Sequence, residues 1–327
     1  MIDKIAVVLI LLYVITLICL IIHIYCYIHD IPKTIFENIQ TPVKQSDFKN
    51  NHIKVWTYWE GKPSKIADIC SKSISYSCEQ ANKLLIDKFY EYIHITPDNI
   101  DKYLGKDLKQ YVCYTVDDII LKSDLIRLSL LQKYGGFWLD MSILVLKPIN
   151  MIFEEKHKYD HFYAIYNPRN DSSNLPNYPV IEMSMMYSPP NHPLIKDWLN
   201  GMNFIEKCDV NDRINYSHSK QFFKSIKFLQ PSHHYSYYVF RHVLINSGGL
   251  HKYNNVFLIS DHKKKYMGFL HYNIKDLLEL PQQEFEKKYN LKNTTCIKLC
   301  GFYDRKILEN IIKNGTYHPE SVMRVDA

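Results

Sequence analysis

The sequence lacks the short motifs that define several common enzyme classes. It contains no Gly-x-Ser-x-Gly nucleophile turn, no glycine-rich loop ending in Gly-Lys-Ser or Gly-Lys-Thr, and no His-Glu-x-x-His pattern. The usual serine hydrolases, P-loop nucleotidases and zinc proteases therefore have no support in the sequence. The net charge is a modest +6, and no basic repeat is interleaved with aromatic residues. We therefore expect no nucleic-acid partner.

Paired cysteine motifs are also missing. The chain has eight cysteines, but no two form a Cys-x-x-Cys pair. The spacings of Cys70 with Cys78, and of Cys296 with Cys300, match neither a zinc site nor a redox motif. The sequence therefore favours buried free thiols, while disulfides stay open for a body that lies in an oxidising lumen.

Charge is absent from one long stretch near the start of the chain. From Ile5 to Ile28 there is no Asp, Glu, Lys or Arg, and the stretch is long enough to cross a bilayer, which takes roughly 20 apolar residues. A cleaved signal peptide has a shorter apolar core of roughly 7 to 15 residues and a small-x-small site, which is missing here. We therefore expect a tail at 1–4, one transmembrane anchor at 5–28 and a polar stem at 29–50.

Lysines lie on both sides of the anchor, so the positive-inside rule does not decide its orientation. We expect a single-pass type II membrane protein with a lumenal body, and a body that faces the cytosol stays open. Asn-x-Ser/Thr triplets would accept glycans only in a secretory lumen. The chain has four of them, at Asn170, Asn215, Asn293 and Asn314.

The folded body begins with alternating strand and helix patterns. β-branched and aromatic residues predict a strand at Ile53–Trp59, and a second strand is predicted at Tyr92–Ile95. Between them, apolar spacing predicts helices at Ser64–Lys72 and Cys78–Tyr90. This alternation indicates an α/β fold with a mainly parallel sheet covered by helices on both faces.

A longer helix follows at Ile119–Tyr134, where the apolar stripe is dense. Thr115, with an acid three residues on, resembles a capping box at its start. Gly135-Gly136 supplies the stop, because glycine suits the left-handed conformation at a helix end. Short apolar strands are predicted at Phe137–Leu139 and Ile143–Leu146.

The second half of the chain has weaker patterns. We expect strands at Val180–Tyr187 and Phe269–Tyr272, a helix at Leu194–Leu199, and further helical stretches near Gln221, Tyr237 and Glu284–Tyr289.

Chemically informative residues lie around the long helix. Asp124 and Arg127 are three residues apart on one helix face, where a carboxylate can accept from ribose hydroxyls and a guanidinium can pair with phosphate. A surface ion pair is the alternative for that spacing. Asp140 follows a strand, and ligands of open α/β sheets lie beyond the carboxyl ends of strands. A carboxylate there suits Mn²⁺ or Mg²⁺, which prefer oxygen ligands.

The segment SDLIRLSLLQKYGGFWLD, residues 123–140, resembles the SDxxRxxxLxxxGGxxxD signature of glycosyltransferases with a GT-A fold. The similar families are the family 32 mannosyl- and galactosyltransferases, the bacterial capsular polysaccharide synthesis proteins and the glucosyltransferase domains of clostridial toxins. The resemblance extends more loosely from Ile31-Pro32-Lys33 through about Pro148 and more thinly to Leu199. It implies a nucleotide-sugar site in residues 51–165 and an acceptor-binding, C-terminal part in residues 166–327.

The resemblance also implies residue roles. Asp124 and Arg127 match positions that hold the ribose and sugar of the donor, and Asp140 matches the first acid of the DxD metal motif. Ser142 takes the third position of that motif, where many relatives have a second Asp and capsular-type proteins commonly have a hydroxyl residue. The candidate for a further metal ligand is His271, with His251 and Asp261 as alternatives.

Aromatic residues end the first predicted strand, where related enzymes bind the nucleotide base. Trp56, Thr57 and Trp59 are therefore candidates for base binding, with simple core packing as the alternative for the tryptophans.

These observations predict a membrane-anchored hexosyltransferase that transfers a sugar from a nucleotide-sugar to a carbohydrate hydroxyl. A UDP-sugar is the first candidate donor and a GDP-sugar the second. The resemblance implies retention of configuration, with Asp140 and Arg127 as the catalytic residues and Mn²⁺ or Mg²⁺ as cofactor. Two alternatives stay open. One is an inactive, membrane-tethered scaffold of the same fold, and the other is a hydrolase that uses Asp124 and Asp140 as acid and base.

Overall fold

The structure is a computed structural model. All of the residues that it describes belong to one compact unit of the chain, Thr41–Ala327. The tail, anchor and stem expected at 1–50 lie outside the described residues, and within the described residues no helix has both the length and the apolar content to span a bilayer. The described residues are 52–85, 88–152, 159–166, 177–220, 223, 226, 230–260, 266–267, 273–299 and 301–323.

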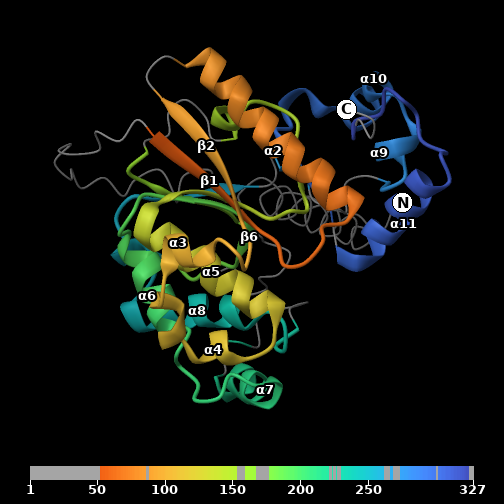
Figure 1. The fold of residues 1–327 in the computed structure, drawn as a ribbon. Helices are drawn as coiled ribbons and strands as arrows, with labels where there is room; N and C mark the ends of the chain where they lie inside the picture. Colours follow the sequence, from red (N-terminus) through yellow and green to blue (C-terminus); the bar gives the residue numbers. More distant parts are fainter. Residues whose placement is uncertain are drawn as a thin grey trace, which may run out of the picture. The chain divides into compact units, whose positions relative to one another are not determined.

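A six-stranded sheet forms the centre of this unit, with the strand order β2-β1-β3-β6-β5-β7 (Figure 1). β1 is parallel to β2 and β3, and β5 is parallel to β7, whereas β6 is antiparallel to both of its neighbours. The predicted mainly parallel α/β sheet is therefore confirmed. The strands are β1 His52–Tyr58, β2 Phe89–Ile95, β3 Gly136–Leu139, β5 Phe162–Tyr166, β6 Ile181–Ser188 and β7 Val256–Ser260.

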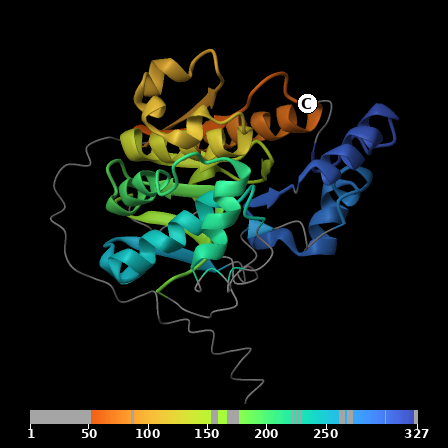
Figure 2. The same cartoon turned by 90° about the horizontal axis from the view of Figure 1, so that it is seen from below.

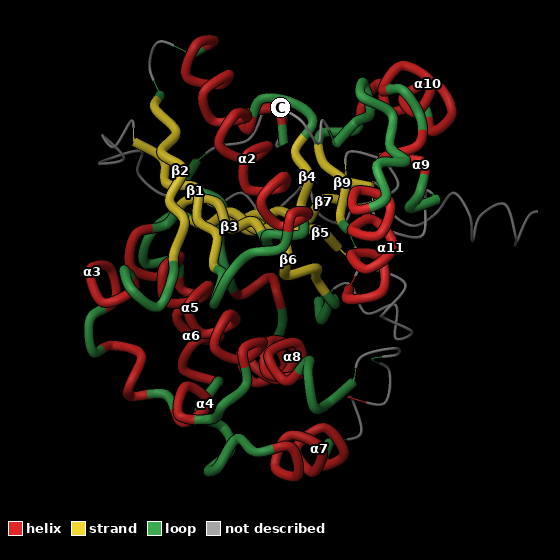
Figure 3. The backbone as a smooth tube through the Cα atoms, turned by 45° about the vertical axis from the view of Figure 1, so that its right-hand side comes forward, coloured by secondary structure: helices red, strands yellow, loops and turns green. Residues whose placement is uncertain are grey.

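Helices cover both faces of this sheet, as predicted (Figure 3). On one face, Ile74 and Cys78 of α2 (Lys65–Leu84) pack in one buried cluster with Val55 and Phe137. On the other face, α5 contacts β1, β3 and β6, and α6 packs against both α5 and α8. The bounds of these helices are α5 Ile119–Tyr134, α6 Pro193–Gly201 and α8 Tyr235–Ser247.

A smaller three-stranded sheet, β4-β9-β8, brings the C-terminal segment next to the N-terminal end of α2. Leu144, Ile297 and Leu299 pack there with Ile66 of α2 and Phe285. Figure 2 shows this segment in blue. The remaining elements are α3 Ile100–Leu104, α4 Val112–Thr115, β4 Ile143–Val145, α7 Val210–Ser219, β8 Tyr266–Met267, α9 Asp276–Glu279, α10 Gln282–Tyr289, β9 Cys296–Lys298 and α11 Gly301–Lys313.

Several element boundaries differ from the prediction. The two helices expected between the first strands are one helix, α2, which the Ser64 side chain caps. The second of them was expected to reach Tyr90, but Tyr90 belongs to β2, because β-strand pairing with β1 overrides the helical spacing of its apolar residues. The cap of α5 is Asp118, whose carboxylate accepts from two backbone N–H groups, whereas Thr115 ends α4.

A disulfide links Cys113 of α4 to Cys208, directly before α7. The expectation of free thiols is therefore wrong for this pair, because the fold brings together two cysteines that are far apart in sequence. It holds for Cys70, Cys78 and Cys296, which keep buried thiol groups.

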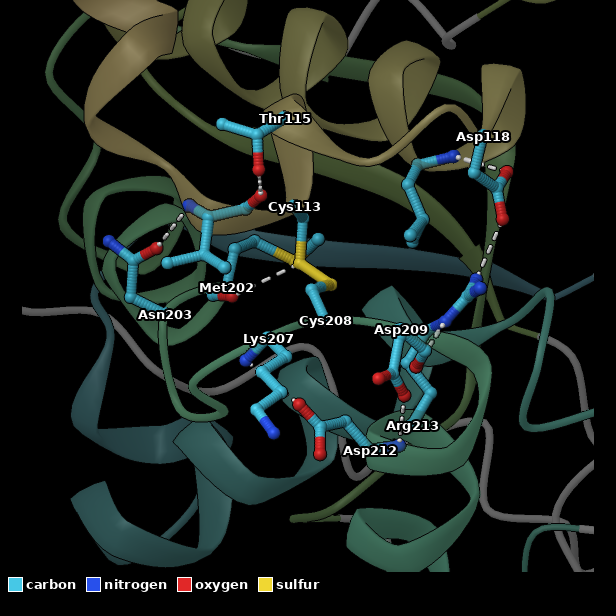
Figure 4. The surroundings of a disulfide bond; sticks show 12 residues. Cys113, Thr115, Asp118, Met202, Asn203, Lys207, Cys208, Asp209, Asp212 and Arg213 are labelled. Carbon is cyan, nitrogen blue, oxygen red and sulfur yellow. Dashed lines mark hydrogen bonds and ion pairs between the residues drawn. A yellow bond between two sulfur atoms is a disulfide. The ribbon is translucent and has the colours of Figure 1, made fainter.

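Close to the disulfide, Nη1 of Arg213 in α7 lies 2.8 Å from the Asp118 carboxylate (Figure 4). The disulfide and this buried ion pair both attach α7 to the segment that leads into α5.

Gly136 determines how closely β3 approaches β1. Its φ is 98°, and a Cβ atom at this position would lie 2.2 Å from the carbonyl oxygen of Lys54 in β1. Glycine is therefore required at position 136 for two reasons. The positive φ disfavours a side chain, and there is no room for a Cβ atom.

Replacing Gly136 with alanine should destabilise the protein by at least about 3 kcal/mol, because overpacking adds to the backbone strain. Gly61 is a matched control, since it also has a positive φ of 77°, but a Cβ atom added there would meet nothing within 4 Å. Gly61→Ala should cost only about 1 kcal/mol. Urea unfolding of the two variants measures the difference, and equal losses would contradict the steric argument.

Candidate active site

The long helix α5 carries the first two site residues, as the sequence predicts. Asp124 and Arg127 are both buried, with 4% and 5% of their surface exposed, and Nη1 of Arg127 lies 3.0 Å from Oδ1 of Asp124. The i,i+3 spacing therefore produces an ion pair, but a buried one and not the surface pair that was the alternative. A buried ion pair leaves neither group in free contact with water.

Asp140 directly follows β3, at the carboxyl end of that strand. Its backbone N–H donates to the carbonyl oxygen of Ser184 in β6, which fixes its position at the sheet edge. Its Oδ1 accepts from Nη2 of Arg127 and from Nε1 of Trp138, both at 2.9 Å. The same guanidinium therefore joins Asp124 on the helix to Asp140 on the sheet.

The second oxygen of Asp140 faces a residue that sequence reasoning missed. Nζ of Lys298 lies 2.8 Å from Oδ2 of Asp140 and 2.7 Å from Oγ of Ser142. Lys298 ends β9, where it pairs with Ile143 of β4, and the next residue, Leu299, donates its N–H to the Ser142 carbonyl oxygen. No motif marks Lys298, and only the pairing of β4 with β9 brings it to the site.

The charges of this cluster shift the acidity of its carboxyl groups. Burial alone would raise the pKa of Asp140, but Lys298 and Arg127 outweigh it and hold that pKa below its usual range. Burial raises the pKa of Asp124 to about 7, against the opposing effect of Arg127. Asp140 is therefore the permanently ionised acid of the site, and Asp124 titrates near neutral pH.

Of the three residues proposed to bind the base, Trp56 and Thr57 lie near the end of β1 and Trp59 directly follows that strand. Trp56 is completely buried, and its indole N–H donates to the carbonyl oxygen of Gly135 at 2.8 Å. Thr57 is also buried, 3.0 Å from both Tyr92 Oη and His94 Nδ1. Trp56 thus has a core position with no exposed ring face, whereas Trp59 is only partly buried. Of the two tryptophans, Trp59 alone retains surface for a base.

The donor atoms near Asp140 do not fit a divalent cation as they are arranged. Such an ion takes six or more oxygen ligands, usually with carboxylates among them. In the described part of the chain, no three His, Cys, Asp or Glu side chains gather as a metal site. The carboxylate of Asp140 and the hydroxyl of Ser142 share the Lys298 ammonium instead.

One of the three other metal candidates lies among the described residues. His271 and Asp261 lie outside the described residues. His251 lies within them and is exposed, in the turn that follows α8.

A mainly parallel sheet with an acid at the end of β3, joined through arginine to the helix before it, is the arrangement that the GT-A resemblance of the sequence predicts. The sequence matches the family model described as capsular polysaccharide synthesis protein over residues 23–299. The chain therefore belongs to the capsular polysaccharide synthesis protein family. No curated protein matches the sequence.

Solved glycosyltransferases resemble the structure only distantly. One, involved in glycosylation of the major capsid of PBCV-1, has a TM-score of 0.39 and 10% identity, covering 80% of this chain and 98% of that chain. The galactosyltransferase LgtC, in complex with donor and acceptor sugar analogues, has a TM-score of 0.37 and 10% identity. The likeness covers 76% of this chain and 88% of the LgtC chain. GlyE of Streptococcus pneumoniae has a TM-score of 0.35 and 8% identity. The likeness covers 82% of this chain and 65% of the GlyE chain. No residue role follows from likenesses of this strength.

The raised pKa of Asp124 predicts how stability depends on pH. Between the ordinary value of 3.8 and about 7, the folded protein holds a proton that the unfolded chain has lost. The stability from this proton is complete at low pH and is lost as the pH rises through 7. The free energy of unfolding of the wild type, measured by urea unfolding, should therefore fall between about pH 4 and about pH 7, by at most about 1.4 kcal/mol per pH unit.

Asp124→Asn should flatten this dependence, because it removes the titrating group. Asp101→Asn, at an exposed position of α3, should leave the slope unchanged. An identical slope in wild type and Asp124→Asn would show that Asp124 does not titrate in this range.

Proposed function

We propose that this glycosyltransferase transfers a sugar from a nucleotide-sugar to a carbohydrate hydroxyl, with retention of configuration as its family resemblance implies. A UDP-sugar is the first candidate donor and a GDP-sugar the second. The observation that carries the proposal is the ionised Asp140 at the carboxyl end of β3, held by Arg127 and Lys298. Ligands of α/β sheets bind at that edge, and the family match covers the whole segment.

Within this proposal, Arg127 acts as a positioning residue. Its two terminal nitrogens bind Asp124 and Asp140, and its guanidinium carbon lies 4.9 Å from the ring centre of Trp138. The guanidinium therefore sets the orientation of the Asp140 carboxylate toward the donor. Asp124 keeps Arg127 in place from the helix, and its burial argues against a role as the acid of a hydrolase.

The divalent cation implied by the family resemblance is not a part of this proposal. Asp140 and Ser142 already bind the ammonium of Lys298, so the residues that the structure describes do not make a metal site.

Replacing Asp140 with asparagine should lower kcat/KM by about 100-fold or more, because Arg127 and Lys298 lose the carboxylate that holds them in position. The assay is release of UDP or GDP from a panel of nucleotide-sugars by the purified full-length chain in detergent. Asp101→Asn is the control and should retain wild-type activity.

Two outcomes would contradict the proposal. Full activity in Asp140→Asn would exclude the site described here. A wild-type chain that binds neither UDP nor GDP and releases no nucleotide would favour the inactive scaffold instead.

We further propose that the chain is anchored by residues 5–28 with its body on the lumenal or extracytoplasmic side. The Cys113–Cys208 disulfide supports this orientation, because disulfides persist in oxidising compartments and are rare in the cytosol. Asn215 and Asn314, each in an Asn-x-Ser/Thr triplet, are exposed, which leaves both side chains accessible to modification.

This topology is tested by labelling thiols with a membrane-impermeant maleimide in intact membrane vesicles. Cys113 and Cys208 are completely buried, so they should react only in opened vesicles, after the protein is unfolded with denaturant and the disulfide is reduced. In the variant Cys113→Ser, Cys208 should react in denaturant without reduction, and only once the vesicles are opened. Labelling of both wild-type cysteines on the cytosolic side without a reductant would refute the lumenal orientation.

A further inference from the structure

Lys298 lies between the two side chains of the DxD-like motif. Its ammonium donates to Oδ2 of Asp140 and to Oγ of Ser142, which are the two groups that this motif would offer to a metal. A positive charge therefore already stands where the motif would place a cation.

The backbone delivers this ammonium and holds it there. Lys298 pairs with Ile143 across the β4–β9 ladder, and the neighbours Ile297 and Leu299 are completely buried. The Lys298 side chain is 16% exposed. It is anchored on both sides by core residues, keeps some exposed surface, and lies at the sheet edge next to Asp140, where ligands of α/β sheets bind.

The charges around Asp140 disfavour a second cation. Oδ1 of Asp140 binds Arg127 and Trp138, and Oδ2 binds Lys298. A divalent ion bound to the same carboxylate would lie within a few ångströms of the ammonium and close to the guanidinium. Like charges at such distances repel strongly in a partly buried site. Burial also raises the pKa of Asp124 to about 7. Asp124 therefore offers less negative charge to offset the repulsion between a metal ion and the two basic side chains.

We propose that Lys298 is a catalytic residue that takes the place of the divalent cation and stabilises the departing nucleoside diphosphate. This inference rests on the proposed function. In the reaction, the bond between the anomeric carbon and the β-phosphate oxygen breaks, and its electron pair stays on that oxygen. The acceptor hydroxyl oxygen bonds to the anomeric carbon, and its proton passes to the released diphosphate. Lys298 keeps its own protons and contributes positive charge to the diphosphate, as lysine does in other phosphate sites.

The test measures binding and turnover with the full-length chain. UDP and GDP binding is measured by calorimetry, in EDTA and with Mn²⁺, and nucleotide release from the matching nucleotide-sugars is measured in the same buffers. The wild type should bind its nucleoside diphosphate and release it in EDTA, with less than about a threefold change on adding Mn²⁺.

Variants of Lys298 distinguish the effect of losing its ammonium charge from the effect of disturbing the fold. Lys298→Met keeps the length of the side chain but not the charge, and it should weaken diphosphate binding in EDTA by about 10- to 100-fold. Lys298→Arg should stay within about fivefold of the wild type, because it keeps the charge with a different geometry. Lys292→Ala removes an exposed lysine on the approach to β9 and should change neither binding nor turnover. Thermal melts establish that each variant is folded.

The proposal is overturned if EDTA abolishes binding and turnover in the wild type and Mn²⁺ restores them, because Lys298 would then be a placeholder that a metal displaces. It is also overturned if Lys298→Met binds the diphosphate as tightly as the wild type. Failure of the proposed function looks different, since the wild type would then bind neither UDP nor GDP in any buffer.

Discussion

The buried guanidinium of Arg127 connects the two layers on which the active site is built. It binds Asp124 on α5 with one nitrogen and Asp140 after β3 with the other. Removing one member of such a buried charge cluster typically costs about 3–5 kcal/mol, because the remaining charges lose their partners. The orientation of the Asp140 carboxylate follows from this contact. With Oδ1 turned to Arg127, Oδ2 faces β9 and receives Lys298.

The parts of the site that the sequence predicts are those encoded locally. Ile119–Tyr134 forms a helix over the predicted residues, and Asp140 stands where the predicted strand ends. Both follow from patterns within a short segment, namely an apolar stripe, a Gly-Gly stop and a short apolar strand. Lys298 could not be predicted in this way. β9 spans only Cys296–Lys298, which is too short for a periodic signal, and its partner strand lies in the other half of the chain.

Other differences have the same physical origin. Cys113 and Cys208 are 95 residues apart, and sequence spacing gives no sign of their proximity. An aromatic residue at a strand end can stack on a ligand or fill the core, and the residue type alone does not distinguish these roles. For Trp56 the outcome depends on Tyr103 and Tyr134, whose rings pack against its indole. Tertiary packing, and not local pattern, determines each of these results.

The late position of β9 has a consequence for biosynthesis. Lys298 follows Asp140 by 158 residues, so the ribosome makes α5 and all six strands of the central sheet before it makes the lysine. Until then, Asp140 and Ser142 face an edge without their β9 partner. The nascent enzyme thus acquires the full charge pattern of its site only after nearly all of its body has been synthesised. With the role proposed for Lys298, competence for catalysis therefore arises late, with the pairing of β4 and β9.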